Sequence, residues 1–147
     1  MQYNSLKNLV LAVFLAFMFF SIPSVRAEVT ELDNDGLKRL VAEGVVLVDI
    51  RRPDEWQQTG TIAGSHLITF FHDKEYKVFD MSAWLLELHK IAKPEQPVIL
   101  ICRSGNRTKS VSNYLDQKAG YTKVYNVTEG ITRWIKDGNP VAPYLLK

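Results

Sequence analysis

The chain has 147 residues, a length that suits one domain of ordinary size. It carries 18 Lys and Arg residues against 16 Asp and Glu residues, and it has no basic run interleaved with aromatic residues. This charge pattern does not support a nucleic-acid-binding protein. With 46% hydrophobic residues, the chain has enough apolar side chains to build a single core.

The amino terminus has the features of a secretory signal peptide. Lys7 gives it a positive start, residues 9–20 form an unbroken apolar run, and small residues precede a cleavage point after Ala27. The run is shorter than the roughly 20 residues that a spanning helix needs. We therefore expect residues 1–27 to be a cleaved leader and residues 28–147 to be exported, either periplasmic or secreted. The alternative is an uncleaved leader, which would anchor the protein to a membrane.

Strand and helix patterns alternate along the remainder of the chain. Strands are expected at residues 28–30, 45–50, 66–70, 97–102 and 123–127. Helices are expected over residues 34–43, from residue 53, over 82–92 with Ser82 as the cap, over 108–119 and over 131–135, with Trp84 and Trp134 in the core. This order predicts one α/β domain with a mainly parallel sheet and right-handed crossovers.

Cys102 is the only cysteine, and it follows the apolar run that ends at Ile101. It has no partner for a disulfide within the chain, so in an oxidising compartment its thiol is either buried or used. In open α/β sheets, ligands bind beyond the carboxyl ends of the strands. Cys102 is expected at such an end.

The loop after Cys102 favours a reactive thiol over an inert core cysteine. Backbone N–H groups of residues 103–108 are expected around the sulfur, and a helix beginning near Thr108 adds the positive end of its dipole. Both favour the thiolate and would also hold an anion carried on the sulfur. Gly105 lets the backbone turn beside the sulfur, and Arg103 is placed to attract an anionic substrate.

The loop from Cys102 to Thr108 resembles the active-site loop of the rhodanese-type sulfurtransferases, which reads C-x-x-G-x-R-[ST]. Residues 47–56 resemble the amino-side motif of the same family, in which Asp-x-Arg ends a strand and an acid and an aromatic residue follow. The two motifs stand in the family's order. The whole resemblance extends over residues 28–138.

Two more stretches are similar to motifs of this family and depart from them in places. Residues 60–65 are similar to a G-H-I-x-G-A turn, with Thr61 where the family has His and Ser65 where it has Ala. Residues 129–134 match a G-G-x-x-x-W stretch, with Glu129 in place of the first glycine. We interpret the first two departures as variations of a turn.

The resemblance implies a sheet of about five parallel strands flanked by helices on both faces. It also implies that Cys102 takes sulfane sulfur from a donor such as thiosulfate and passes it, as a persulfide, to a thiophilic acceptor such as cyanide or a thiol. The loop that binds the substrate anion would consist of Arg103, Ser104, Gly105, Asn106, Arg107 and Thr108. No cofactor is expected, and no metal site either, because the three histidines are irregularly spaced.

Asp49 ends a predicted buried strand, where an unpaired carboxylate would be costly. We predict that Arg107 pairs with Asp49 and braces the loop. Arg51 is expected to support the active face and Arg52 to face solvent. Glu55 is interpreted as one of the acidic residues at the start of a helix.

Other functions remain open from the sequence. Phosphatases and arsenate reductases of similar fold are one alternative, although five residues separate cysteine and arginine in the related phosphatases and four separate Cys102 and Arg107. The shorter loop suits one sulfur atom better than a phosphate group. A non-catalytic binding or redox-sensing module is the other alternative. The sequence does not indicate the oligomeric state.

Overall fold

The computed structural model describes residues 28–145. The predicted signal peptide, residues 1–27, lies outside the described residues, so cleavage and export remain predictions. Within the described part, no helix combines the length and the apolar character that crossing a membrane requires.

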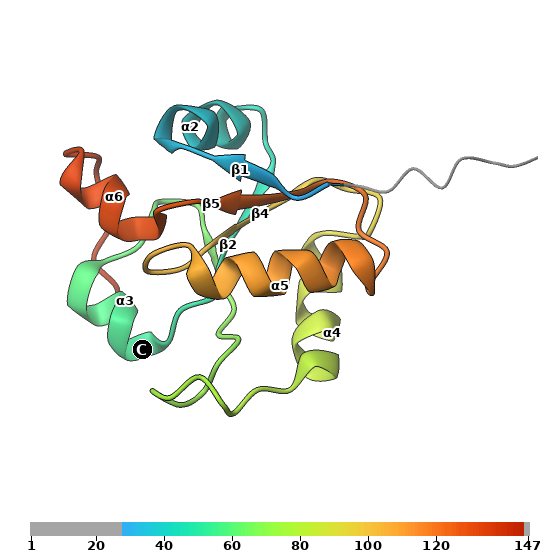
Figure 1. Cartoon of the computed structure of the whole chain (residues 1–147). Coiled ribbons are helices and arrows are strands. Elements are labelled where there is room, and N and C mark those ends of the chain that lie inside the picture. Colours follow the sequence, from blue (N-terminus) through green and yellow to red (C-terminus); the bar gives the residue numbers. More distant parts are fainter. Residues whose placement is uncertain (1–27, 146–147) are drawn as a thin grey trace, which may run out of the picture.

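Strands and helices alternate along the described chain (Figure 1). The strands are β1 (Thr30–Leu32), β2 (Val46–Asp49), β3 (His66–Leu67), β4 (Val98–Ile101) and β5 (Val124–Val127). The helices are α2 (Asn34–Ala42), α3 (Pro53–Thr59), α4 (Met81–Ile91), α5 (Asn106–Gln117) and α6 (Gly130–Lys136).

The strands form one sheet in the order β1-β5-β4-β2-β3, and every pair is parallel. β4 lies at the centre, between β5 and β2. Because all strands run the same way, their carboxyl ends meet at one edge, where a ligand is expected in such folds. The predicted fold of about five parallel strands is confirmed.

Helices cover both faces of the sheet, as Figure 1 shows for α2 and α6 on one face and α4 and α5 on the other. Successive side chains of β4 point to opposite faces, so the strand contributes to two cores. Val98 and Leu100 pack with α4 and α5, while Ile99 and Ile101 pack with α2 and α6. This double burial explains why β4 is apolar at every position.

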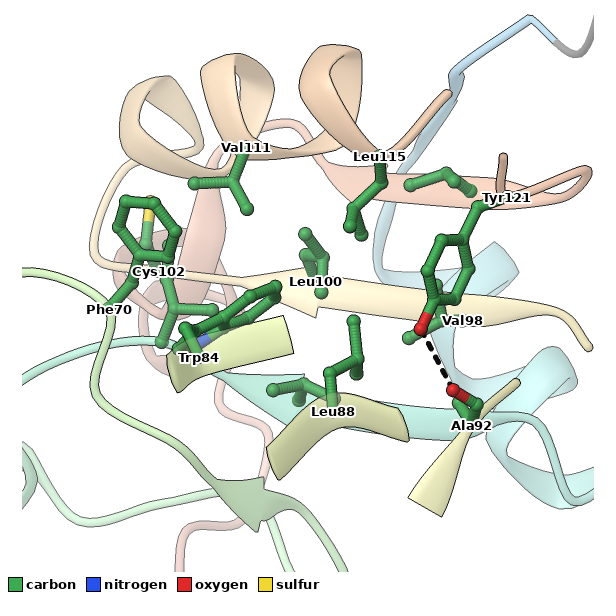
Figure 2. Packing of buried hydrophobic residues seen from close by; sticks show 13 residues of the cluster. Phe70, Trp84, Leu88, Ala92, Val98, Leu100, Cys102, Val111, Leu115 and Tyr121 are labelled. Atoms are coloured by element: carbon green, nitrogen blue, oxygen red, sulfur yellow. Dashed lines mark hydrogen bonds between the residues drawn. The ribbon is translucent and has the colours of Figure 1, made fainter. Parts of the chain in front are cut away.

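The expected core tryptophans are buried, one on each face. Trp84 of α4 belongs to the first core and Trp134 of α6 to the second. Figure 2 shows the first core, in which the Tyr121 hydroxyl donates a hydrogen bond of 2.8 Å to the Ala92 carbonyl. Cys102 belongs to this core as well.

Several boundaries differ from the sequence prediction. β1 lies two residues later than the expected 28–30, because residues 30–32 are the ones that pair with β5. α4 begins at Met81, because the Asp80 carboxylate rather than Ser82 caps it by accepting from the Ala83 N–H at 3.0 Å. The third strand ends at Leu67, because its partner β2 ends at Asp49.

Another difference is the start of α5, which lies two residues before the predicted position, at Asn106. Gly105 caps this helix with a φ of 85°, a left-handed conformation that lets the chain turn into the helix directly after the cysteine. α5 therefore begins inside the Cys102 loop and not after it.

Candidate active site

Cys102 lies immediately after β4, at the carboxyl edge of the sheet, and its relative exposure is 0%. It shares a buried cluster with Phe70 and Val111, and Figure 2 shows these three residues at one end of the cluster. The loop 103–108 and the start of α5 follow at once. The sequence-based placement of Cys102 at a strand end, facing the amino end of a helix, is confirmed.

The loop is folded around the sulfur. The Gly105 N–H donates to Cys102 Sγ at 3.2 Å, and Thr108 Oγ1 lies 3.4 Å from the same atom. The Thr108 hydroxyl also donates to the Gly105 carbonyl at 3.0 Å, which ties the loop to the first turn of α5. A Cβ at position 105 would collide with the Thr128 carbonyl oxygen, so only glycine fits there.

The amino end of α6 holds the loop backbone from the other side. The Ile131 N–H donates to the Cys102 carbonyl at 2.9 Å, and the Thr132 N–H donates to the Arg103 carbonyl at 3.1 Å. Gly130 allows this approach, because a Cβ there would collide with the Cys102 carbonyl oxygen. The stretch 129–134 thus has a structural reason for its glycine, while the departure at Glu129 falls beside it.

The predicted pairing of Asp49 with Arg107 is wrong. Asp49 instead binds Arg51, whose Nε and Nη2 atoms donate to the carboxylate at 2.9 Å and 2.6 Å. Both side chains are about 1% exposed. The remaining donors of Arg51 reach Thr59 Oγ1 at 2.7 Å and the Gly60 carbonyl at 2.8 Å. A residue only two positions away therefore satisfies the buried carboxylate, and Arg51 fastens the turn after α3 to the end of β2.

Arg107 binds Glu55 of α3 with a two-pronged contact, at 2.8 Å from Nη1 and 2.6 Å from Nη2. The side chains are 10% and 8% exposed. Burial opposes the charge on Glu55, but hydrogen bonds from Arg107 and the Arg52 N–H outweigh it and lower the pKa of the carboxyl. Burial likewise opposes the charge on Arg107, yet its hydrogen bonds with Glu55 raise the pKa. The pair is ionised and connects the Cys102 loop to α3.

Tyr76 covers this ion pair from the segment between β3 and α4. Its ring centroid lies 4.7 Å from Arg107 Cζ and 5.7 Å from Arg52 Cζ, distances that allow cation–π contacts. The Arg52 side chain is only 12% exposed and contacts Asp54 and Glu55 at 3.0 Å and 3.4 Å. The expectation that Arg52 faces solvent is therefore wrong.

The remaining loop residues, Arg103, Ser104 and Asn106, are exposed. They are the residues of the predicted anion-binding loop that solvent reaches most directly. Of the histidines, His66 and His72 are exposed and His89 is partly buried. Within residues 28–145, no group of three or more His, Cys, Asp or Glu side chains is arranged to hold a metal ion.

Thr61 and Ser65, where the turn departs from the family pattern, contribute to it in different ways. Thr61 pairs with Ala142 through backbone hydrogen bonds of 2.9 Å and 2.8 Å, which most side chains would permit. The Ser65 hydroxyl donates to the Ile62 carbonyl at 2.7 Å within the turn. Ser65 thus stabilises the turn locally, while the backbone of Thr61 connects the turn to the chain at Ala142.

A polar hollow of about 500 Å³ lies between α2 and α6. Its charged residues bind one another, since Arg133 contacts Glu129 and Asp137, and Asn34 donates to Asp137 at 2.8 Å. Cys102 is not among its lining residues.

A model of the rhodanese-like domain matches residues 33–137, which include the Cys102 loop, the Asp49–Arg51 pair and α6. The chain belongs to the rhodanese-like domain family. Among its relatives, this rhodanese-like protein is 33% identical over 120 residues to a protein named sulfurtransferase from Allochromatium vinosum, covering 77% of this chain and 94% of the relative.

Two further comparisons agree with this family. The thiosulfate sulfurtransferase GlpE of Pseudomonas entomophila is 30% identical over 95 residues, which cover 65% of this chain and 74% of the relative. A rhodanese-related protein of Thermoplasma volcanium has a solved structure similar to this rhodanese-like protein, with a TM-score of 0.58 and 27% identity. The match covers 78% of this chain and 99% of that one.

Sequence reasoning missed two residues of the site in this rhodanese-like protein. The sequence favours Glu55 as a helix-start charge first and a substrate contact second, although its place in the amino-side motif is a signal that it contributes to the site. Tyr76 lies in a segment without periodicity, and its contact with Arg107 depends on how the chain returns over the loop. No local pattern could have indicated it.

Proposed function

We propose that this protein is a sulfurtransferase that carries sulfane sulfur on Cys102 as a persulfide. The observation that carries the proposal is the loop closed around the sulfur, with the Gly105 N–H donating to Cys102 Sγ at 3.2 Å. Such a donor stabilises negative charge on the thiolate and on a sulfur bound to it. The sulfurtransferase names of two relatives support the same chemistry.

The proposed reaction needs no external oxidant or reductant. The Cys102 thiolate attacks the outer sulfur of a donor such as thiosulfate, a new S–S bond forms, and sulfite leaves with the electron pair of the broken bond. An acceptor such as cyanide or a thiolate then attacks the outer sulfur of the persulfide. Cys102 leaves again as a thiolate, and thiocyanate or a new persulfide is released.

The contacts of Arg107 speak against the phosphatase alternative. Both of its terminal nitrogens donate to Glu55, which leaves the two-pronged face of the guanidinium occupied. A phosphate bound at Cys102 would need such a face for its equatorial oxygens. In the proposed reaction Arg107 is a positioning residue that connects the loop to α3.

One observation favours the non-catalytic alternative, namely the complete burial of Cys102. Steady-state turnover separates the two functions. Incubation with thiosulfate and cyanide should form thiocyanate continuously, and Cys102→Ser should abolish it because serine cannot form a persulfide. If the unaltered protein forms no thiocyanate and no other sulfur product from a thiol acceptor, the sulfurtransferase proposal is wrong.

We also propose that the protein acts after export, in the periplasm or outside the cell, on the basis of residues 1–27. Sequencing the amino terminus of the protein isolated from cells tests this. A first residue of Glu28 is expected, and an intact Met1 would contradict cleavage.

A further inference from the structure

An apolar groove of about 390 Å³ lies beside the Cys102 site. One wall contains Phe70, Phe79 and Met81, which precede or begin α4, and the other contains Ser110, Val111 and Tyr114 of α5. No charged residue lines it, and the hydroxyls of Ser110 and Tyr114 are its only side-chain polar groups. This volume and composition are typical of a small-molecule site.

The groove is continuous with exposed apolar surface on the segment between β3 and α4. Phe79 stacks on Phe70 with ring centroids 5.3 Å apart, yet it remains 49% exposed. Tyr76 and Val78 are 41% and 58% exposed. An apolar surface of this kind next to a reactive group indicates contact with an apolar ligand or partner.

Two residues connect the groove to the reactive sulfur. Phe70 and Val111 line the groove and also belong to the buried cluster that contains Cys102 (Figure 2). Cys102 Sγ is itself covered, but a persulfide places the reactive sulfur about 2 Å beyond Sγ, the length of an S–S bond. A molecule that lies in the groove therefore contacts Phe70 and Val111, the two residues that the groove shares with the cluster of Cys102.

We propose that this groove binds the apolar body of a small acceptor thiol, so that the preferred acceptor carries an aryl or alkyl group and not a charged one. The inference rests on the proposed sulfurtransferase function and specifies its acceptor. Carboxylates or ammonium groups of a polar thiol would lose water in a groove without partners for them. The uncharged lining thus selects against such acceptors.

The transfer is balanced in atoms and electrons. The acceptor thiolate attacks the outer sulfur of the Cys102 persulfide and forms a new S–S bond. The bond between that sulfur and Sγ breaks, and Cys102 takes the electron pair as a thiolate. No oxidant or reductant is consumed.

The test compares two acceptors on the full-length protein after loading with thiosulfate and removal of the excess. Phenylmethanethiol represents the apolar acceptor and 2-mercaptoethanesulfonate the charged one, at equal thiolate concentrations. Intact mass spectrometry follows the loss of the extra sulfur with time. We expect phenylmethanethiol to react about tenfold faster at subsaturating concentration, since even one methylene group in an apolar pocket changes kcat/KM by about that factor.

Two variants on exposed positions of α5 locate the effect. Ser110→Trp places a large ring in the groove and should reduce the ratio of the two rates toward one. Asn113→Trp adds the same ring outside the groove and should leave the ratio unchanged. Circular dichroism checks that both variants are folded.

Equal rates for the two thiols, or an unchanged ratio in Ser110→Trp, would overturn the inference while the loaded sulfur still supports the proposed function. A change of oligomeric state in Ser110→Trp without an effect on the ratio would also overturn it, because the groove would then be an interface between copies. If neither thiosulfate nor polysulfide loads Cys102, the proposed function fails and the acceptor inference with it.

Discussion

The ion pair between Glu55 and Arg107 connects the Cys102 loop to α3 and should stabilise the fold measurably. Glu55→Gln removes the charge but keeps the shape, so it leaves the Arg107 guanidinium nearly buried without a counter-ion. Removing one partner of a buried pair costs about 3–5 kcal/mol. We expect the lower end, about 3 kcal/mol, because the side chains are 8–10% exposed and Tyr76 still covers the guanidinium.

Urea unfolding of the full-length protein measures this loss as a lower midpoint concentration, with an unchanged slope of the unfolding free energy against urea concentration. Glu87→Gln is a matched control, since Glu87 pairs with Lys90 at side-chain exposures of 54% and 65%. An exposed pair of this kind contributes about 0–1 kcal/mol. The double variant Glu55→Gln/Arg107→Met removes both charges and should be more stable than Glu55→Gln alone. If Glu55→Gln is no less stable than Glu87→Gln, the bracing role of the pair is refuted.

Three further changes test the Glu55 carboxyl, the Gly105 turn and the Asp49–Arg51 pair. Because the pKa of the Glu55 carboxyl is lowered in the folded state, its ionised form stabilises the fold above the unfolded-state pKa of about 4.3, and this stabilisation is lost as the pH falls through the folded-state pKa. The urea midpoint should therefore drop less steeply below about pH 4.5 in Glu55→Gln than in the unaltered protein, and parallel curves of midpoint against pH would contradict this. Gly105→Ala should destabilise the protein and abolish sulfur loading, because the added Cβ collides with the Thr128 carbonyl oxygen. Gly64→Ala is the control at a similar φ of 80° with no neighbouring atoms; it should lower the free energy of unfolding by only about 1–2 kcal/mol and still load sulfur. Similar behaviour of the two variants would disprove the steric argument. Asp49→Asn should lower the free energy of unfolding by about 3–5 kcal/mol, because it deprives the buried Arg51 of its counter-ion, and an unchanged urea midpoint would show that the pair contributes nothing.

The sequence predicted the fold well because local patterns and global architecture agree in this chain. β4 is apolar at all four positions, which is required of a strand buried on both faces, and the helical stripes containing Trp84 and Trp134 each face one of the two cores. The position of Cys102 at the end of this strand followed from the same pattern. The main errors were at element ends, where a single side-chain cap such as Asp80 decides the boundary.

The contacts between charged side chains could not be predicted in the same way. Asp49 needed a cationic partner, and both Arg51 and Arg107 were available in the sequence. In the structure Asp49 pairs with Arg51, because two residues that are close together at a strand end can form an ion pair without any rearrangement of the loop. Arg107 is then left for Glu55, and the choice depends on where α3 lies relative to α5, which is a property of the tertiary fold.

Intact mass measurement after exposure to thiosulfate tests the central claim most directly. The account predicts a gain of one sulfur atom, located on Cys102 by peptide mapping, absent from Cys102→Ser and released again by cyanide. If the unaltered protein gains no sulfur from thiosulfate or polysulfide, or keeps the added sulfur when Cys102 is replaced, Cys102 is not the carrier.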